Sequence, residues 1–166
     1  MNNITILNTG GTFNKLYDPI DGVLKVQKSN KAIKIIFSNF IKSNQKPNIK
    51  GLIYKDSLDI TKKDRAKIIK KIDTIKDDKI IIVHGTDTID LTAKYIQKRV
   101  KNKIIILTGA MQPFSIEPIE ATANIISAYG YIQNCKKNGV YIAMNGCIKP
   151  YKNIKKDRVA GVFICQ

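Results

Sequence analysis

Short apolar runs, several of them followed closely by glycine, alternate along the chain with longer segments in which apolar residues recur every three or four positions. The runs are too short for helices and rich in isoleucine, so they predict buried β-strands. They lie at residues 4–9, 50–54, 80–83, 104–107 and 140–144, and a sixth is predicted over 159–164. A run that is apolar at every position is typical of a parallel strand covered on both faces.

Helical spacing is found in four segments between these runs. The first begins near Ser29 or Asn30, either of which can act as an N-cap. The second opens at residues 61–64 with the pattern of a capping box, the third includes 91–96, and the fourth spans 117–132. Alternation of strand and helix predicts right-handed βαβ units. We therefore expect one α/β domain over residues 1–166, with a parallel, doubly wound sheet and helices on both faces.

Composition and charge argue against several classes of protein. No apolar run reaches the ~18 residues of a membrane helix, and the first seven residues lack the basic region of a secretory signal. The net charge of +16 suggests nucleic acid, but Arg65, Arg99 and Arg158 are the only arginines. Joint enrichment in lysine and isoleucine indicates a compositional bias, whereas nucleic-acid sites favour arginine. We expect a cytoplasmic protein with no specific nucleic-acid partner and no membrane attachment.

Cysteine and histidine are too few for most metal sites. The three cysteines, Cys135, Cys147 and Cys165, show no metal-ligand spacing, so free thiols in a reducing compartment are expected. His84 is the only histidine, which excludes a multi-histidine zinc site. Because it directly follows a predicted strand, a structural role in which it bonds a loop carbonyl is favoured over a role as general base. No metal or cofactor is expected.

Three turns after predicted strands carry candidate chemistry, because the ligand site of a parallel sheet lies beyond the carboxyl ends of its strands. They are Thr9-Gly10-Gly11-Thr12, His84-Gly85-Thr86-Asp87-Thr88 and Thr108-Gly109-Ala110-Met111-Gln112-Pro113. Each alone also fits a structural interpretation: a simple turn, a helix cap or close packing of a helix on the sheet. Neither Gly-x-Gly-x-x-Gly nor Gly-Lys-Ser/Thr occurs, so nucleotide binding is disfavoured.

Taken together and in this order, the three turns resemble those of the bacterial-type L-asparaginase (asparaginase/glutaminase) family, over residues 4–163. Members usually carry a large N-terminal α/β domain and a smaller C-terminal domain. The chain is similar to the N-terminal domain alone, as in short single-domain forms, so the resemblance implies a flavodoxin-like fold with the C-terminal domain absent. It also implies hydrolysis of L-asparagine, or a related amide, to aspartate and ammonia through a threonine acyl-enzyme.

The resemblance assigns roles position by position. The catalytic set that it implies is Thr12, Tyr17, Thr86 and Lys156. The substrate-binding set is Gly11, Ser57 and Asp87. Thr12 would be the nucleophile and Tyr17 would assist it from a loop that closes over the substrate, while Lys155 is the alternative to Lys156. Ser57 would bind the α-carboxylate of the substrate and Asp87 its α-ammonium group.

Amide hydrolysis also needs donors for the oxyanion, and backbone N–H groups of the Gly10-Gly11 and Gly85-Thr86 turns are expected to supply them. Leu58 departs from the family, in which a glutamine commonly follows the serine. Glu120 stands in place of a family aspartate, and Asn124 matches the asparagine that follows it. Longer members complete their site with groups from a neighbour's C-terminal domain, so we expect a homodimer or higher homo-oligomer. The alternative function is a non-catalytic module that binds an amino acid or amide in the same pocket.

Overall fold

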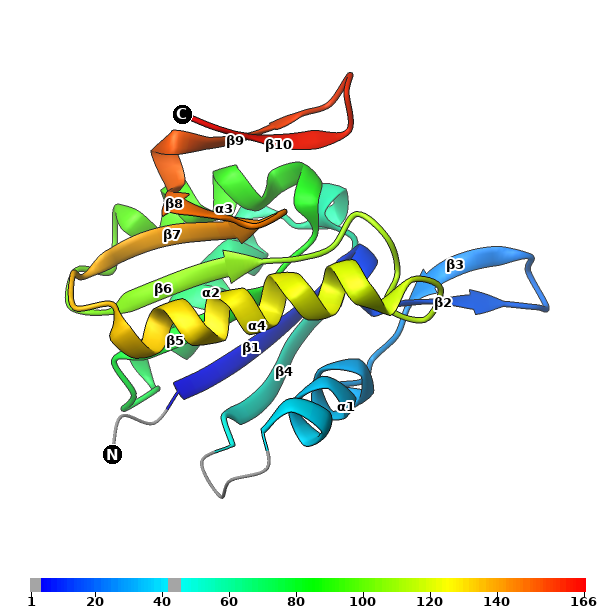
Figure 1. Cartoon of the computed structure of the whole chain (residues 1–166), viewed down its shortest axis with the longest axis horizontal. Helices are drawn as coiled ribbons and strands as arrows, with labels where there is room; N and C mark the ends of the chain where they lie inside the picture. The colour runs from blue at the N-terminus through cyan, green and yellow to red at the C-terminus, as the bar shows by residue number, and fades with distance from the viewer. Residues whose placement is uncertain (1–3, 42–45) are drawn as a thin grey trace.

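A six-stranded sheet, in which five strands run parallel, forms the centre of the molecule (Figure 1). The computed structural model describes residues 4–41 and 46–166. The strand order is β4-β1-β5-β6-β7-β8, and β8 pairs antiparallel with β7. The strands are β1 (Ile4–Gly10), β4 (Asn48–Lys55), β5 (Lys79–Val83), β6 (Ile104–Thr108), β7 (Gly139–Met144) and β8 (Cys147–Pro150). The five predicted parallel strands are confirmed.

Helices cover both faces of the sheet. Helices α1 (Lys31–Phe40) and α4 (Pro118–Asn134) lie on one face, and α2 (Lys62–Asp73) and α3 (Ile89–Gln97) lie on the other (Figure 1). Alternate side chains of one strand serve the two faces: Ile81 packs with α1 and α4, whereas Ile80 and Ile82 pack with α2 and α3. The predicted doubly wound α/β fold is confirmed.

The predicted capping box at the start of α2 is confirmed. Thr61 Oγ1 accepts a hydrogen bond from the Asp64 amide, and Asp64 Oδ2 accepts one from the Thr61 amide. The same carboxylate receives Lys55 Nζ at 2.8 Å, which links the end of β4 to the helix. Burial raises the pKa of Asp64, but the hydrogen bonds from Lys55 and Thr61 outweigh burial and lower it to about 2.

The strand predicted over residues 159–164 was placed wrongly. Strand β10 (Val162–Cys165) pairs antiparallel with β9 (Ile154–Asp157) in a separate two-stranded sheet, and β8 takes the sixth place in the main sheet. Asp157 Oδ1 accepts hydrogen bonds from the amides of Val159 and Ala160, and Gly161 has a φ of 68°. These residues therefore form a turn, because local side-chain bonds and a left-handed glycine end the strand.

The expectation of three free thiols is also wrong. Cys147 on β8 and Cys165 on β10 form a disulfide, with their Cα atoms 6.6 Å apart, and Cys135 is free. The hairpin of β9 and β10 folds back over β8, so two cysteines separated by 18 positions meet. Because disulfides are most common in oxidising compartments, this pairing does not support the cytoplasmic prediction.

No helix within residues 4–41 and 46–166 is long and apolar enough to cross a membrane. The prediction of no secretory signal rests on residues 1–7, and residues 1–3 of that segment lie outside the described ranges.

Candidate active site

The three candidate turns lie at one edge of the sheet because their strands are neighbours in register. Asn8 of β1 pairs with Val83 of β5, and Val83 pairs with Thr108 of β6. The residues that follow these positions leave the sheet at its carboxyl edge, where a doubly wound fold places its ligand site.

A close approach of two glycines brings the first and second turns together. Gly11 has a φ of 77°, and a Cβ atom added to it would lie 2.4 Å from both the Cα and the amide nitrogen of Gly85. Thr12 follows Gly11 and begins the short helix η1 (Thr12–Asn14), while Thr86 follows Gly85 and begins η3 (Thr86–Thr88). Only glycine fits such an approach. The two threonines are therefore each next in sequence to a residue at the contact point.

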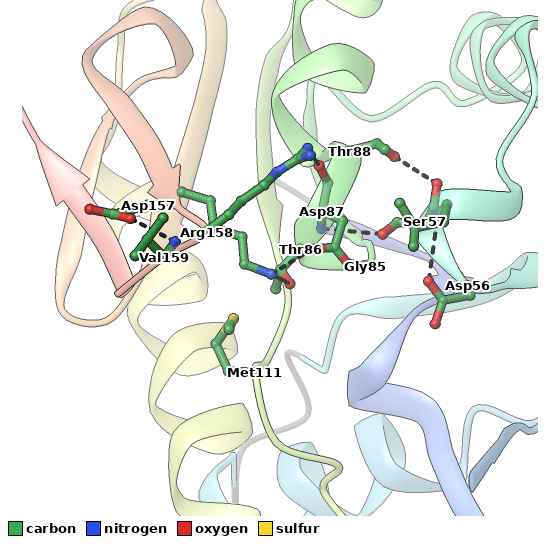
Figure 2. A network of polar contacts seen from close by, with 12 residues as sticks. Asp56, Ser57, Gly85, Thr86, Asp87, Thr88, Met111, Asp157, Arg158 and Val159 are labelled. Atoms are coloured by element: carbon green, nitrogen blue, oxygen red, sulfur yellow. Dashed lines mark hydrogen bonds and ion pairs between the residues drawn. The ribbon is translucent and has the colours of Figure 1, made fainter. Parts of the chain in front are cut away.

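Ser57 joins the second turn from another side. It begins the short helix η2 (Ser57–Asp59) after β4, and it is buried. A Cβ atom on Gly85 would lie 2.6 Å from the Ser57 Cβ. Ser57 Oγ accepts a hydrogen bond from the Asp87 amide at 3.2 Å, and Thr88 Oγ1 donates to the Ser57 carbonyl at 2.8 Å (Figure 2). Ser57 is thus held against the turn that carries Asp87.

The Lys15–Asp56 ion pair connects the glycine-rich turn to the Ser57 turn. Lys15 Nζ lies 2.6 Å from Asp56 Oδ2, and Asp56 Oδ1 accepts a hydrogen bond from the Leu58 amide. Burial raises the pKa of Asp56, but the Lys15 ammonium and the Leu58 amide outweigh burial and hold it below its usual value. Leu58 itself is 69% exposed, at the rim of the site.

Lys156 reaches the second turn from β9. Its Nζ donates hydrogen bonds to Thr86 Oγ1 at 2.8 Å and to Asp87 Oδ1 at 2.7 Å, and its side chain is 13% exposed. Lys155, which precedes it on the strand, is exposed. Of the two lysines considered from the sequence, Lys156 is the one that contacts Thr86 and Asp87.

Arg158 is a contact that the sequence reasoning missed. Its Nη2 donates a hydrogen bond to the Asp87 carbonyl at 2.7 Å, so the hairpin of β9 and β10 touches the Thr86-Asp87 turn through both Lys156 and Arg158 (Figure 2). No pattern in the sequence indicated this contact, because Arg158 lies just beyond β9 and its partner is a backbone carbonyl 71 positions away.

Glu120 and Asn124 shape the third turn. Both carboxylate oxygens of Glu120 accept from the Met111 amide, and one also accepts from the Gln112 amide. Asn124 Nδ2 donates to the Gly109 carbonyl at 3.0 Å. A Cβ atom on Gly109 would lie 2.3 Å from the His84 carbonyl oxygen, so the third turn also packs closely on the second.

Tyr17 lies apart from these contacts. It belongs to the hairpin of β2 (Lys15–Asp18) and β3 (Val23–Val26), which projects from the sheet (Figure 1). Its side chain is 62% exposed. The structure therefore places Tyr17 on a strand of a hairpin, and its assisting role stays a prediction.

One part of the expected oxyanion site is wrong. The Gly10 amide donates to Asn8 Oδ1 at 3.0 Å, and the Gly11 amide donates to the Lys55 carbonyl at 2.8 Å. An amide already committed to a protein acceptor is not available to an oxyanion. The Gly85-Thr86 turn remains the predicted source of donors.

Gly11→Ala is expected to lower the free energy of unfolding by about 3 kcal/mol, because it adds backbone strain and a clash with Gly85. Gly22→Ala is the matched control: Gly22 has a φ of 67°, but nothing lies within 4 Å of an added Cβ. The control is expected to lose about 1 kcal/mol from strain alone. Urea unfolding followed by circular dichroism measures both, and equal losses would contradict the close approach.

Comparison with known proteins identifies the family of the chain. The family model described as "Asparaginase, N-terminal" matches residues 3–161. Over 96% of its length the chain is 29% identical to a protein of Haemophilus influenzae named probable L-asparaginase periplasmic, and 28% identical to L-asparaginase 2 of Escherichia coli. It covers 48% of each of these relatives, so the chain spans about half the length of the curated relatives that it matches.

The fold is found in solved structures as well. The thermostable L-asparaginase from Thermococcus kodakarensis superposes with a TM-score of 0.81 at 24% identity, over 98% of this chain and 51% of that one. A probable cytoplasmic L-asparaginase from Campylobacter jejuni gives 0.80 at 23% identity, over 99% and 53%. With a family model that matches nearly the whole chain, the sequence belongs to the asparaginase family and corresponds to its N-terminal domain.

Proposed function

We propose that the protein is an L-asparaginase-like amidohydrolase, which hydrolyses the side-chain amide of L-asparagine, or of a related amide, to aspartate and ammonia. The observation that carries the proposal is the contact of Lys156 Nζ with Thr86 Oγ1 and Asp87 Oδ1. An amine, a hydroxyl and a carboxylate are joined there, next to the point where Gly11 meets Gly85. The names of the relatives, L-asparaginase and glutaminase-asparaginase, support the same class of reaction.

In the proposed reaction, Thr12 Oγ1 attacks the carbonyl carbon of the amide. Its proton passes through the Thr86 hydroxyl and the Lys156 amine to the amide nitrogen, the C–N bond breaks, and ammonia leaves. Water then attacks the threonine ester, a proton returns to the Thr12 oxygen, and aspartate is released. A hydroxyl is a weak nucleophile until a neighbouring group takes its proton, and the Thr86–Lys156 contact offers a route for it.

The binding groups of the proposal surround this centre. Asp87 carries the charge that would attract an α-ammonium group, and Ser57 lies against the same turn. The Gly85 and Thr86 amides are the proposed oxyanion donors, and losing one such donor typically lowers the rate about a hundred- to a thousandfold. Tyr17 is proposed to assist Thr12 when the hairpin of β2 and β3 moves toward the site.

An ammonia-release assay across L-asparagine, L-glutamine and other primary amides tests the proposal. We expect release from at least one of them, with equimolar aspartate formed when the substrate is L-asparagine. Isothermal titration calorimetry with L-aspartate measures binding in the same preparation. The absence of ammonia release from every amide of the panel would refute the proposal, whether or not L-aspartate binds.

A second candidate is a non-catalytic module that binds an amino acid or amide. Leu58 favours it, because an exposed leucine stands beside Ser57 where the family commonly has a glutamine, and leucine cannot hydrogen-bond a ligand. The module predicts binding in the calorimeter with no ammonia formed.

We further propose that the protein acts in the cytoplasm as a homodimer or higher homo-oligomer. The cytoplasmic placement follows the probable cytoplasmic L-asparaginase of Campylobacter jejuni, whereas the Haemophilus influenzae relative is named periplasmic and the Cys147–Cys165 disulfide favours an oxidising compartment. Self-association is supported by the exposed apolar side chains on the two hairpins, among them Leu16, Ile20, Val159 and Val162.

A further inference from the structure

His84 is the first residue of the second turn and is fully buried, and the proposed mechanism does not use it. Both ring nitrogens have partners: Nδ1 lies 2.8 Å from the Gly85 carbonyl oxygen, and Nε2 lies 2.9 Å from Thr92 Oγ1 on α3. The contact with a loop carbonyl agrees with the structural role expected from the sequence. The hydrogen bonds of His84 and of its partner Thr92 define this structural role more closely.

The hydrogen-bond chain around His84 determines its tautomer. Arg65 Nε can only donate, and it donates to Thr92 Oγ1 at 3.0 Å. The Gly85 carbonyl oxygen can only accept, so Nδ1 carries the imidazole hydrogen and donates it. Nε2 of the neutral ring then accepts from the Thr92 hydroxyl.

Burial, more than the charges around the ring, keeps the ring neutral. Burial lowers the pKa of His84, the hydrogen bond to Gly85 raises it, the Arg65 cation on α2 lowers it and the Asp90 carboxylate on α3 raises it, with a net value of about 4. A neutral ring is the form that the Thr92 hydroxyl requires, because a protonated Nε2 could not accept its hydrogen.

Gly85, which His84 holds, is the residue on which the site converges. Gly11 packs on it from the first turn and Ser57 packs on it from η2. Arg65 reaches the Ser57 turn as well, since its Nη1 donates to the Ile60 carbonyl at 3.1 Å and the Ile60 amide donates to the Ser57 carbonyl at 3.3 Å. One chain of polar groups, buried at His84 and Thr92 and partly buried at Arg65, thus supports two of the segments that form the site.

We propose that His84 is a positioning residue: its Nδ1–H fixes the Gly85 carbonyl and so sets the placement of the Thr86-Asp87 turn against Gly11 and Ser57. The part of this inference that concerns reaction rate rests on the proposed function. The part that concerns the order of the turn does not.

Two substitutions separate the contacts of the ring. Asparagine places its amide near the position of Nδ1, so His84→Asn retains a donor for the Gly85 carbonyl. Glutamine reaches the position of Nε2, so His84→Gln retains the contact with Thr92 and loses the one with Gly85. If the Gly85 contact positions the turn, His84→Asn is expected to lower kcat less than about tenfold and His84→Gln about 10- to 100-fold, with KM changed less than kcat.

Two measurements do not depend on activity. Because the chain has one histidine, a long-range ¹H–¹⁵N spectrum of labelled protein shows a single imidazole, and at pH 7 we expect the Nδ1–H tautomer. Hydrogen exchange of peptides that cover residues 85–88 is expected to rise at least about tenfold in His84→Gln and to stay near wild type in His84→Asn. Peptides from β7 serve as the internal control.

The outcomes are distinguishable. An Nε2–H tautomer, or equal exchange at residues 85–88 in the two variants, would overturn the positioning role whether or not the protein is an enzyme. Absence of ammonia release from the wild type, together with the expected tautomer and exchange, would overturn the proposed function and leave the positioning role supported. Should either variant unfold, Thr92→Val replaces it. The Gly85 carbonyl is expected to keep the Nδ1–H tautomer, while the ¹⁵N signal of Nε2 is expected to shift because that nitrogen loses its hydrogen-bond donor. An unchanged Nε2 signal would contradict the chain of bonds.

Discussion

Thr12→Ala is expected to abolish ammonia release, with a fall of at least about a thousandfold in kcat, because the substitution removes the proposed nucleophilic oxygen. The fold is expected to persist, since Thr12 is only partly buried and lies at the start of a short helix. Ammonia release under saturating substrate measures the effect, and the midpoint of urea unfolding checks the fold.

Thr12→Ser is the matched control. Serine keeps the hydroxyl, so we expect it to retain a measurable fraction of the wild-type rate and to form an acyl-enzyme that mass spectrometry detects after rapid quenching in acid. Undiminished turnover in Thr12→Ala would remove Thr12 from the role of nucleophile. Equal loss in the alanine and serine variants would show that the threonine contributes through packing.

Lys156→Met is expected to lower kcat at least about a hundredfold. The substitution keeps the unbranched stem and removes the Nζ that contacts Thr86 Oγ1 and Asp87 Oδ1. Thr86 then loses the amine to which it would pass the proton of Thr12, and Asp87 loses its ion-pair partner. Steady-state ammonia release at several pH values measures the loss, because removal of a proton-transfer group changes the pH profile as well as the rate.

Lys155→Met provides the control on the same strand. Lys155 is exposed, and Lys155→Met changes the net charge by the same amount as Lys156→Met. We therefore expect the kcat of the Lys155→Met variant to lie within about threefold of the wild-type value. Together the two variants separate a specific contact from a general effect of positive charge near the site. A large loss in Lys155→Met with a small one in Lys156→Met would show that the neighbouring lysine performs the chemistry.

The main sheet and its helices could be predicted because their signals are strong and local. Four of the five apolar runs, those of β1, β5, β6 and β7, are covered on both faces, and the segments between the runs show helical spacing. Three of the four short hairpin strands, β2, β3 and β9, gave no such signal. Strand β9 carries two lysines and an aspartate in four residues, and β2 is largely exposed, so neither shows the alternation by which a half-buried strand is identified.

The sequence could predict which residues belong to the site better than it could predict the contacts between them. Motif resemblance indicated Thr86, Asp87 and Lys156, but it could not show that the Gly10 and Gly11 amides are already bonded, because those bonds depend on where Asn8 and Lys55 lie in space. Arg158 and the Cys147–Cys165 disulfide depend in the same way on the fold of one hairpin. Local sequence carries no record of such long-range partners.

The glycine pair at the centre of the site has a consequence for mutational libraries. A side chain at position 11 meets the backbone of position 85, and a side chain at position 85 meets Ser57, so each substitution is blocked by a neighbour that a single change does not move. A deep mutational scan selected only for soluble expression is therefore expected to reject non-glycine codons at both places. A failure to accept substitutions at these two positions therefore indicates a steric clash. Substitutions of the neighbouring Thr12 and Thr86 are the ones that test a role in catalysis.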